Sequence, residues 1–423
     1  MSTLTRRNFL AATGVGTVGM VTALGTSISF AAPGVPNDGD VLVVLFLRGG
    51  MDGLSLTPPI TDPTYYDIRP TIAIPQPGQQ NGALRLDSGS NQRARFSSGF
   101  DGAFGLHPAA DALHKGIWAD GRLALIPGAG FPGASFSHFK AMTNHFRGSL
   151  STGVGGGWIG RMVNAQGGPG PVAAVNTESA AALLRGASTS MGVVNSLDSF
   201  RLNGFANAEA ASGALAVAYG GGDSLSAEGR NILSMSQRFQ QLNNERRPMY
   251  ANDAYGRMFN ELGTLLKASP TLGIRAAAIA SGGWDHHRNL GRPGDTDGRF
   301  HSLVSSMANG IQAFAEDTNG LDGITLVVIS EFGRTTNENG NVGTDHGQAT
   351  TMLVAGAGVR GGVYGDDFAE NLSLPPGKRR GAVPIMTDFR KPILEIARKR
   401  ARLADTGSVF PSFTPAGADL GLV

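Results

Sequence analysis

The sequence predicts an α/β protein with a mainly parallel central sheet covered by helices on both faces. Four short apolar runs have the length and composition of buried strands, and each ends in a glycine-rich turn that carries polar groups. These runs are residues 41–47, 123–130, 275–280 and 324–329, and a fifth follows at 350–359. Strands that alternate with helical segments are typical of a parallel sheet with both faces covered.

Three segments between and after these runs predict helices. Residues 300–317 place apolar side chains on one stripe at helical spacing: Phe300, Leu303, Val304, Met307, Ile311 and Phe314. Residues 111–118 carry a shorter version of the same pattern. Thr387 and Asp388 are the predicted N-cap of a helix over 389–404, whose basic residues gather toward its C-terminal end, where they suit the helix dipole.

The composition indicates a globular chain of enzyme size. It has 423 residues, 16% of them charged and 62 of them glycine, with a formal net charge of +2, so nothing points to nucleic acid as a partner. No Pro/Ser-rich linker, charge run or repeat divides the chain, and we expect one domain over residues 32–423. Because cysteine is absent, disulfides and thiolate ligands are excluded. Any metal must be held by His, Asp and Glu.

Residues 1–31 have the pattern of a twin-arginine signal peptide. Arg6 and Arg7 precede a mild apolar run, and the small-residue site Ser29-Phe30-Ala31 predicts cleavage near Ala31. An N-terminal membrane anchor is the alternative, but the glycine-diluted run is short and weakly apolar. We expect the twin-arginine machinery to export the protein folded to the periplasm or the extracellular space, with no stable transmembrane anchor after cleavage. Such export often carries a cofactor already loaded.

Polar groups follow the first two predicted strands. In an open α/β sheet ligands bind beyond the carboxyl ends of the strands, so these turns are expected to meet at the active site. The first turn carries Arg48 and Asp52; Asp52 is either a metal ligand or a turn residue that satisfies its own backbone. The second turn carries Ser135, Ser137 and His138 where a helix begins, which suits anion binding or, alternatively, simple N-capping.

The later two turns hold most of the candidate ligands. Asp285, His286 and His287 are consecutive after a strand, and imidazole with carboxylate suits zinc, manganese or a similar ion; a surface histidine pair is the alternative. The last cluster consists of Glu331, Arg334, Asp345 and His346, in which Arg334 either faces an anionic group or pairs with Glu331. Four of the eight histidines sit in or just after these polar turns.

Taken together, ordered pieces along nearly the whole mature chain resemble the DUF1501 family. They include "LVVLFLRGGMDGLSLTPP", "SFSHFKAM", "GGGWIGRMVN", "GGWDHHRN", "ISEFGRTTNENGNVGTDHGQATTMLVAGAGVRGGVYG" and "TDFRKPILE". The family is similar to the alkaline phosphatase-like superfamily, and the resemblance implies a three-layer α/β/α sandwich with a mainly parallel central sheet. The region of about 165–252 then stands as an insertion.

The resemblance also implies roles for individual residues. It gives Asp52 as the first metal ligand, Asp285 with His287 as later ligands, and Ser137 as the nucleophile, with Ser135 in reserve. "TDHG", with Asp345 and His346, looks like the superfamily's "DHG", but Glu331 holds the strand-end carboxylate position and His346 that of the later histidine. Arg334 joins the catalytic group, and substrate-binding roles fall to Arg48, His138 and His286. Phe332 stands where relatives often have a histidine ligand, which weakens the case for a complete two-metal site.

Two functions are therefore expected as alternatives. One is a metal-dependent hydrolase of phosphate- or sulfate-type esters that uses one or two divalent ions, zinc, manganese or calcium, on a small-molecule or glycan ester. The other is a non-catalytic exported protein that binds or helps assemble a surface or extracellular polysaccharide. Formylglycine sulfatase chemistry is disfavoured because the C/S-x-P-x-R signature is missing near residue 137. Fold alone does not choose between the two.

Overall fold

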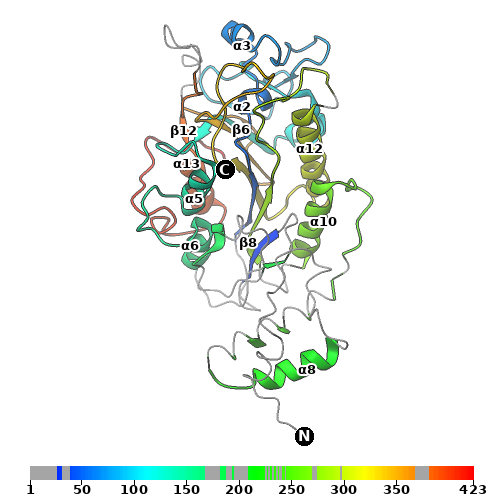
Figure 1. Cartoon of the computed structure of the whole chain (residues 1–423), viewed down its shortest axis with the longest axis vertical. Coiled ribbons are helices and arrows are strands. Elements are labelled where there is room, and N and C mark those ends of the chain that lie inside the picture. The colour runs from blue at the N-terminus through cyan, green and yellow to red at the C-terminus, as the bar shows by residue number, and fades with distance from the viewer. Residues whose placement is uncertain are drawn as a thin grey trace.

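The computed structural model has a mixed α/β architecture built on one long sheet (Figure 1). It describes residues 26–30, 39–166, 182–186, 193–194, 208–223, 244–268, 274–295, 298–366 and 381–423, with a few single positions between 226 and 242. Residues 1–25 and 31–38, which hold most of the predicted leader, lie outside the described residues, as does most of the predicted insertion at 165–252.

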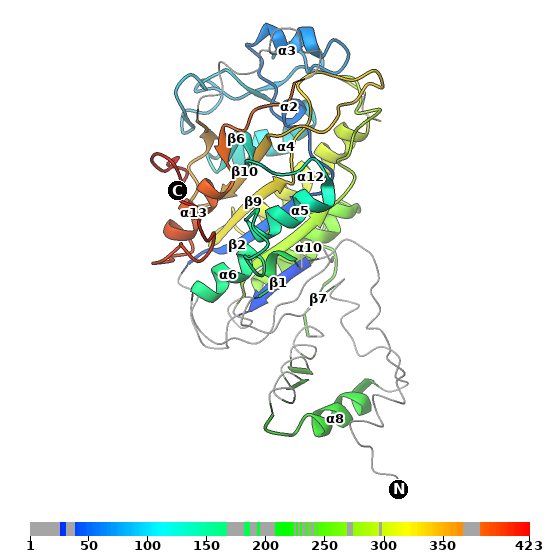
Figure 2. The same ribbon diagram turned by 60° about the vertical axis from the view of Figure 1, so that its left-hand side comes forward.

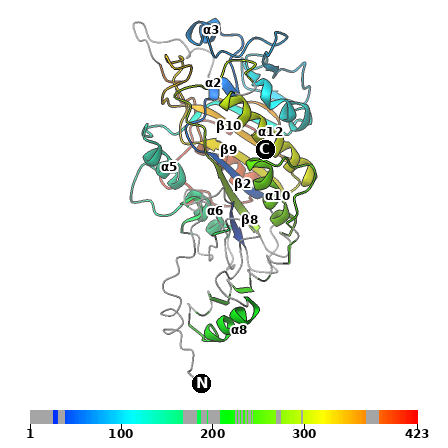
Figure 3. The same ribbon diagram turned by 45° about the vertical axis from the view of Figure 1, so that its right-hand side comes forward.

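Five buried strands form the centre of the sheet, and all five apolar runs predicted as strands are confirmed. They are β2 (Val41–Leu47), β6 (Leu123–Gly130), β8 (Ile274–Ser281), β9 (Ile324–Ser330) and β10 (Thr350–Gly356). Their order is β6-β10-β9-β2-β8, which can be followed across Figures 2 and 3. Strand β2 is parallel to β8 and β9, whereas β10 is antiparallel to both β9 and β6. The carboxyl ends of β2, β6, β8 and β9 therefore share one edge with the start of β10.

Short strands extend the sheet on both sides. β11 (Gly362–Val363), β4 (Arg95–Phe96) and β12 (Thr387–Asp388) continue it beyond β6, all in parallel pairings. On the other side, β1 (Thr26–Phe30) is antiparallel to β8 and pairs with β7 (Val193–Val194). Strand β1 falls inside the segment predicted as the leader. A separate pair consists of β3 (Leu84–Arg85) and β5 (Gly105–Leu106).

Helices cover both faces of the sheet, as the sequence predicts (Figure 1). One face carries α5 (His138–Arg147), α6 (Trp158–Ala165) and α13 (Arg390–Lys399). The other carries α10 (Ala254–Lys267) and α12 (Arg299–Asp317), the latter matching the helix predicted over 300–317. Shorter helices are α2 (Gly53–Leu56) and α3 (Pro63–Ile68), and α8 (Ala208–Ala218) lies within the predicted insertion. Among the described residues, no helix has the length and apolar character needed to cross a membrane.

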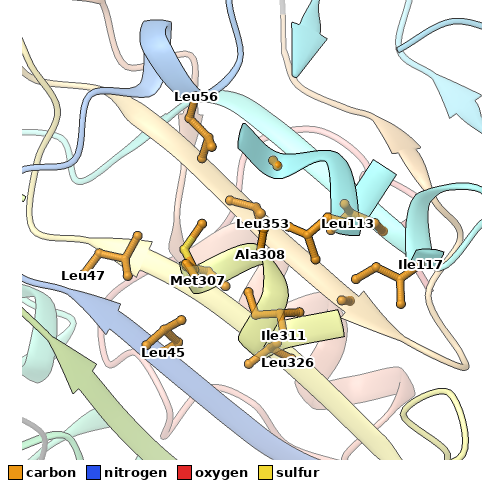
Figure 4. Close-up of a cluster of buried hydrophobic side chains, with 14 of the residues drawn as sticks. Leu45, Leu47, Leu56, Leu113, Ile117, Met307, Ala308, Ile311, Leu326 and Leu353 are labelled. Atoms are coloured by element: carbon orange, nitrogen blue, oxygen red, sulfur yellow. The ribbon is translucent and has the colours of Figure 1, made fainter. Parts of the chain in front are cut away.

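Alternate residues of the central strands feed two hydrophobic cores. In β2, Val43, Leu45 and Leu47 join the core under α10 and α12, while Leu42, Val44 and Phe46 join the core under α6 and α13. Figure 4 shows part of the first core, where Met307 and Ile311 of α12 face Leu45 and Leu326. A strand with two buried faces must be apolar at every position, which explains the continuous runs in the sequence.

Two predicted helices differ from the structure in extent. The segment predicted as one helix over 111–118 is divided into the short α4 (Asp111–Leu113) and a π-helical turn, η2 (His114–Trp118), and a 3-10 turn, η1 (Pro108–Ala110), precedes it. Gly116 breaks the helical path with φ −99° and ψ −110°, and a side chain there would collide with Gln312. The predicted cap of α13 is wrong: its N-cap is Phe389, which makes no side-chain cap, while Thr387 and Asp388 form β12 and Asp388 accepts from the backbone N–H of Arg390 at 3.0 Å. Helix α13 ends at Lys399 rather than residue 404, shortly before Arg402 adopts a left-handed φ of 54°.

Candidate metal centre

The four polar turns meet at one edge of the sheet, as predicted. The backbone N–H of Arg48, after β2, donates to Ser281 at the end of β8 over 2.7 Å, and Trp284 donates back to Arg48 over 3.2 Å. The turn after β2 also contacts the turn after β9, because the N–H of Gly49 donates to Glu331 Oε1 at 2.8 Å. Gly49 has φ +128°, and a Cβ there would lie 2.4 Å from the backbone nitrogen of Asp285. Only glycine lets the turn after β2 approach the turn after β8 so closely.

The loop that carries His346 runs directly beside the turn after β9. Thr335 donates to the carbonyl of Asp345 and Gly347 to the carbonyl of Gly333, both at 2.9 Å. A Cβ on Gly347 would lie 2.0 Å from the carbonyl oxygen of Arg334, so the glycine of "DHG" is required by this close pass. The pairing brings Asp345 and His346 next to the residues at the end of β9, although they follow them by more than ten positions.

Three imidazoles surround the carboxylate of Asp285. His138 Nε2 lies 3.5 Å from Asp285 Oδ2, while His287 Nε2 and His346 Nε2 lie 3.3 and 3.8 Å from Oδ1. One ligand atom each from His138, Asp285 and His346 fall within 4.8 Å of one another, a spacing that could hold a metal ion. The side chain of Asp285 is 47% exposed, so the group is open to solvent.

Each of these imidazoles is anchored through its other ring nitrogen to an oxygen that can only accept a hydrogen bond. Nδ1 of His138 lies 2.8 Å from the carboxylate of Glu331, and Nδ1 of His287 lies 3.1 Å from that of Asp345. Nδ1 of His346 lies 2.7 Å from the carbonyl oxygen of Phe136. Each Nδ1 must therefore carry a proton, and in the neutral form of each ring the Nε2 then holds a lone pair. Histidine ligands of metals commonly show this carboxylate or carbonyl backing.

The Nε2 atoms of the three imidazoles converge on one position. His287 Nε2 and His346 Nε2 are 2.9 Å apart, a distance at which two lone pairs repel unless a proton or a cation lies between them. Within the described part of the chain, His138 Nε2 is buried and receives no hydrogen bond. Burial lowers the pKa of His346 below its ordinary value, which favours the neutral ring that a cation would need. The arrangement fits a bound cation better than a network of hydrogen bonds.

Arg334 holds Asp285 in its ionised form. Its buried guanidinium donates to Asp285 Oδ1 at 2.5 Å and to the carbonyl oxygens of Gly50 at 2.6 Å, Thr344 at 3.2 Å and also Gly49. Burial alone would raise the pKa of Asp285, but the hydrogen bond and the charge of Arg334 outweigh it, and the pKa lies below its ordinary value. Arg334 thus ties three of the four turns together beside the imidazoles.

The comparisons with known proteins identify a family. The model for "Protein of unknown function (DUF1501)" matches residues 116–371, which is more than half of the chain. The chain belongs to the DUF1501 family. No curated protein and no solved structure matches it. The DUF1501 match contains all four residues of the centre, His138, Asp285, His287 and His346, but it begins after Asp52.

Two carboxylates of the DUF1501 region lie behind the imidazoles rather than among the converging atoms. Glu331 is 1% exposed and accepts from the backbone of Gly49 and from His138 through Oε1. Asp345 accepts from His287 and from the amide of Asn339 at 3.2 Å. Both were predicted as metal ligands, and in this structure each accepts from the Nδ1 of a histidine.

Asp52 lies outside the cluster and serves the loop scaffold. Its Oδ1 accepts from the backbone of Ser55 and from the buried guanidinium of Arg69, both at 2.9 Å, and its Oδ2 accepts from Thr344 Oγ1 at 3.0 Å. This matches the alternative in which Asp52 satisfies its own turn. Burial raises the pKa of Asp52, but the charge of Arg69 and the hydrogen bonds lower it by more. The pKa of Asp52 therefore lies below its ordinary value.

The remaining predicted residues occupy three different surroundings. Ser137 is the exposed N-cap of α5, and its side chain makes no capping hydrogen bond. The backbone N–H of Ser137 donates to Ser135 Oγ at 3.1 Å. Both serines flank Phe136, whose carbonyl oxygen anchors His346. His286 points the other way, buried against Phe300 with its Nδ1 3.1 Å from the carbonyl of Trp284, and burial lowers its pKa to about 4. Arg48 lies beside Gly282, where a Cβ would be 3.3 Å from its Nη2.

His138 is the member of the centre whose role the sequence reasoning missed. It was predicted to bind substrate, whereas its Nε2 belongs to the group that could hold an ion. The available signal was its position directly after the second strand's turn, at the same sheet edge as Asp285 and His346. What hid the role is that α5 lies more than a hundred residues before the other ligands.

Proposed function

We propose that this exported DUF1501 protein is a metal-dependent hydrolase of phosphate- or sulfate-type esters. The observation that carries the proposal is the convergence of three imidazole Nε2 atoms on Asp285, each imidazole held by an acceptor at Nδ1. The covered, mainly parallel sheet supports assignment to a three-layer, alkaline phosphatase-like fold. In that fold a site at the carboxyl ends of the strands is expected.

His138, Asp285 and His346 would hold the ion, and His287 offers a further donor beside them. Imidazole nitrogens with one carboxylate suit zinc or a similar transition metal, whereas calcium prefers oxygen ligands. With neutral imidazoles, Asp285, Glu331 and Asp345 carry three negative charges and Arg334 one positive charge, which leaves two to be balanced by a divalent cation. When bound, such an ion supplies Lewis-acid polarisation of an ester oxygen.

The chain's own residues would bind and orient the ester. The N-terminus of the ten-residue helix α5 has no side-chain cap, so backbone N–H groups face the same edge as the cluster and can receive an anionic group. Ser137 is the candidate nucleophile because it is exposed and directly precedes His138; Ser135 is less suited because its hydroxyl oxygen accepts from the Ser137 backbone. Arg334 would keep Asp285 ionised throughout.

The setting of this activity follows from the leader pattern. Residues 1–31 support export in folded form by the twin-arginine machinery, with action on a small-molecule or glycan ester in the periplasm or outside the cell. A cytoplasmic step of metal loading would fit this route.

Hydrolysis assays on the purified protein test the proposal. Protein stripped with a chelator and then reloaded with zinc or manganese should release nitrophenol from aryl phosphate or aryl sulfate esters, and the activity should disappear in His346→Ala. A metal-loaded protein without activity on any such ester, but which retains polysaccharide in a binding assay, would overturn the proposal in favour of the non-catalytic alternative.

A further inference from the structure

The carboxylate predicted as the first metal ligand already has a cation of its own. Asp52 is 1% exposed and Arg69 is fully buried, and the two form an ion pair at 2.9 Å. Arg69 cannot swing away easily, because its Nε donates to the carbonyl of Thr336 at 2.6 Å and its Nη2 to that of Thr335 at 2.7 Å. A metal ion at Asp52 would have to displace Arg69 and leave a guanidinium buried without its counter-charge.

The other residues expected around a second metal ion are also unsuited to binding one. Glu331 accepts at Oε1 from Gly49 and from His138, and its Oε2 lies 3.1 Å from Ser330 Oγ. Phe332 is 3% exposed, and its ring centroid lies 4.8 Å from those of both His138 and His346. The same ring fills the space over the first turn, since a Cβ on Gly50 would lie 2.4 Å from its Cε2. An apolar ring thus stands where a second ion would need a ligand.

We propose that the centre binds a single divalent metal ion. The guanidinium groups of Arg69 and Arg334 supply fixed positive charge in place of a second metal ion. The charge count supports this. Asp52 and Arg69 cancel, and the two negative charges that remain among Asp285, Glu331, Asp345 and Arg334 match one divalent ion. Arg334 lies 2.5 Å from Asp285 Oδ1, so it provides a permanent positive charge at the rim of the site. The inference rests on the proposed metal dependence and adds the stoichiometry and the residues that set it.

Metal stoichiometry tests this inference separately from catalysis. Chelator-stripped protein is incubated with excess zinc chloride, passed over a desalting column and measured by elemental analysis. We expect one zinc ion per chain in the native protein, none retained in His346→Ala, and one still retained in Asp52→Asn. Because Asp52→Asn leaves a buried guanidinium unpaired and can prevent folding, the double variant Asp52→Asn with Arg69→Gln serves as the second measurement and should also retain one ion.

The outcomes separate the two proposals. Two zinc ions per chain, falling to one when Asp52 is replaced, would overturn the single-ion inference while leaving metal-dependent hydrolysis standing. One ion per chain with no ester hydrolysis would overturn the proposed function and leave the inference standing. A native protein that retains no zinc would overturn both.

Discussion

The Nε2 atoms of His287 and His346 lie 2.9 Å apart, and each ring is held from behind by an acceptor oxygen. The two histidines come from different loops, after β8 and before β10, so their meeting is a property of the sheet edge. At this distance either a proton or a cation must lie between the two nitrogen atoms, since two bare lone pairs would repel. The contact therefore ties the geometry of the two loops to metal binding.

His346→Ala should remove one member of the cluster and weaken zinc binding by more than about 100-fold. This loss is larger than the one typical of replacing a residue that only orients a metal ligand. Competition with a coloured chelator measures the affinity. His301→Ala is the matched control, because His301 lies on α12 and packs against His107 rather than the cluster. Unchanged zinc affinity in His346→Ala would show that the converging atoms do not bind the ion.

Glu331→Gln should weaken zinc binding by about 10–100-fold, because a neutral amide orients His138 less firmly and makes its Nε2 less basic. The same chelator competition applies. Glu338→Gln is the control, since Glu338 is half-buried, away from the histidines, and accepts from the backbone of Thr71 and Ile72. If both variants bind zinc equally well, Glu331 has no positioning role.

Arg69→Met should lower the free energy of unfolding by about 3–5 kcal/mol, because it leaves the carboxylate of Asp52 buried without its partner. Urea unfolding at neutral pH measures the change. Lys115→Met breaks the exposed pair with Asp111, in which the Lys115 side chain is 75% exposed, and should cost less than about 1 kcal/mol. Similar losses in the two variants would contradict a special role for the buried pair.

Acid should destabilise the fold through two buried histidines. Burial lowers the pKa of both His107 and His145 to about 3. Since their unfolded pKa is about 6.5, the unfolded chain binds more protons below that pH, and each contributes a loss of about 1.4 kcal/mol per pH unit between 6.5 and 3. Above pH 6.5 neither residue changes the stability.

His145→Leu isolates one of these contributions. His145 packs against Phe131 and Phe389, with ring centroids 5.5 and 4.3 Å away, and the charge of Arg390 further opposes its protonation. The variant should lose stability less steeply than the native protein in urea unfolding between pH 7 and pH 5. An identical pH slope in the two proteins would show that His145 is not kept neutral by the fold.

The fold class and the edge that carries the centre could be predicted from the sequence. Continuous apolar runs at 41–47 and 123–130 predict strands buried on both faces, and the matching strands β2 and β6 have the predicted bounds. The alternation of strands and helices implies parallel pairing, which places their polar turns together. What escaped prediction were local breaks, such as the one at Gly116, because they depend on the approach of Gln312 from another helix.

The sequence by itself determined which edge of the sheet carries the candidate side chains, since the loops that hold them all lie where strands meet that edge. Only the tertiary structure decided their roles. Asp52 forms an ion pair with Arg69, and Glu331 and Asp345 accept hydrogen bonds from histidines. His138 belongs to the group that could hold a metal ion. The physical reason is that a carboxylate's role depends on its nearest partner in space. Those partners lie as far as 292 positions away along the chain, as Asp52 and Thr344 do, and no pattern of spacing records them.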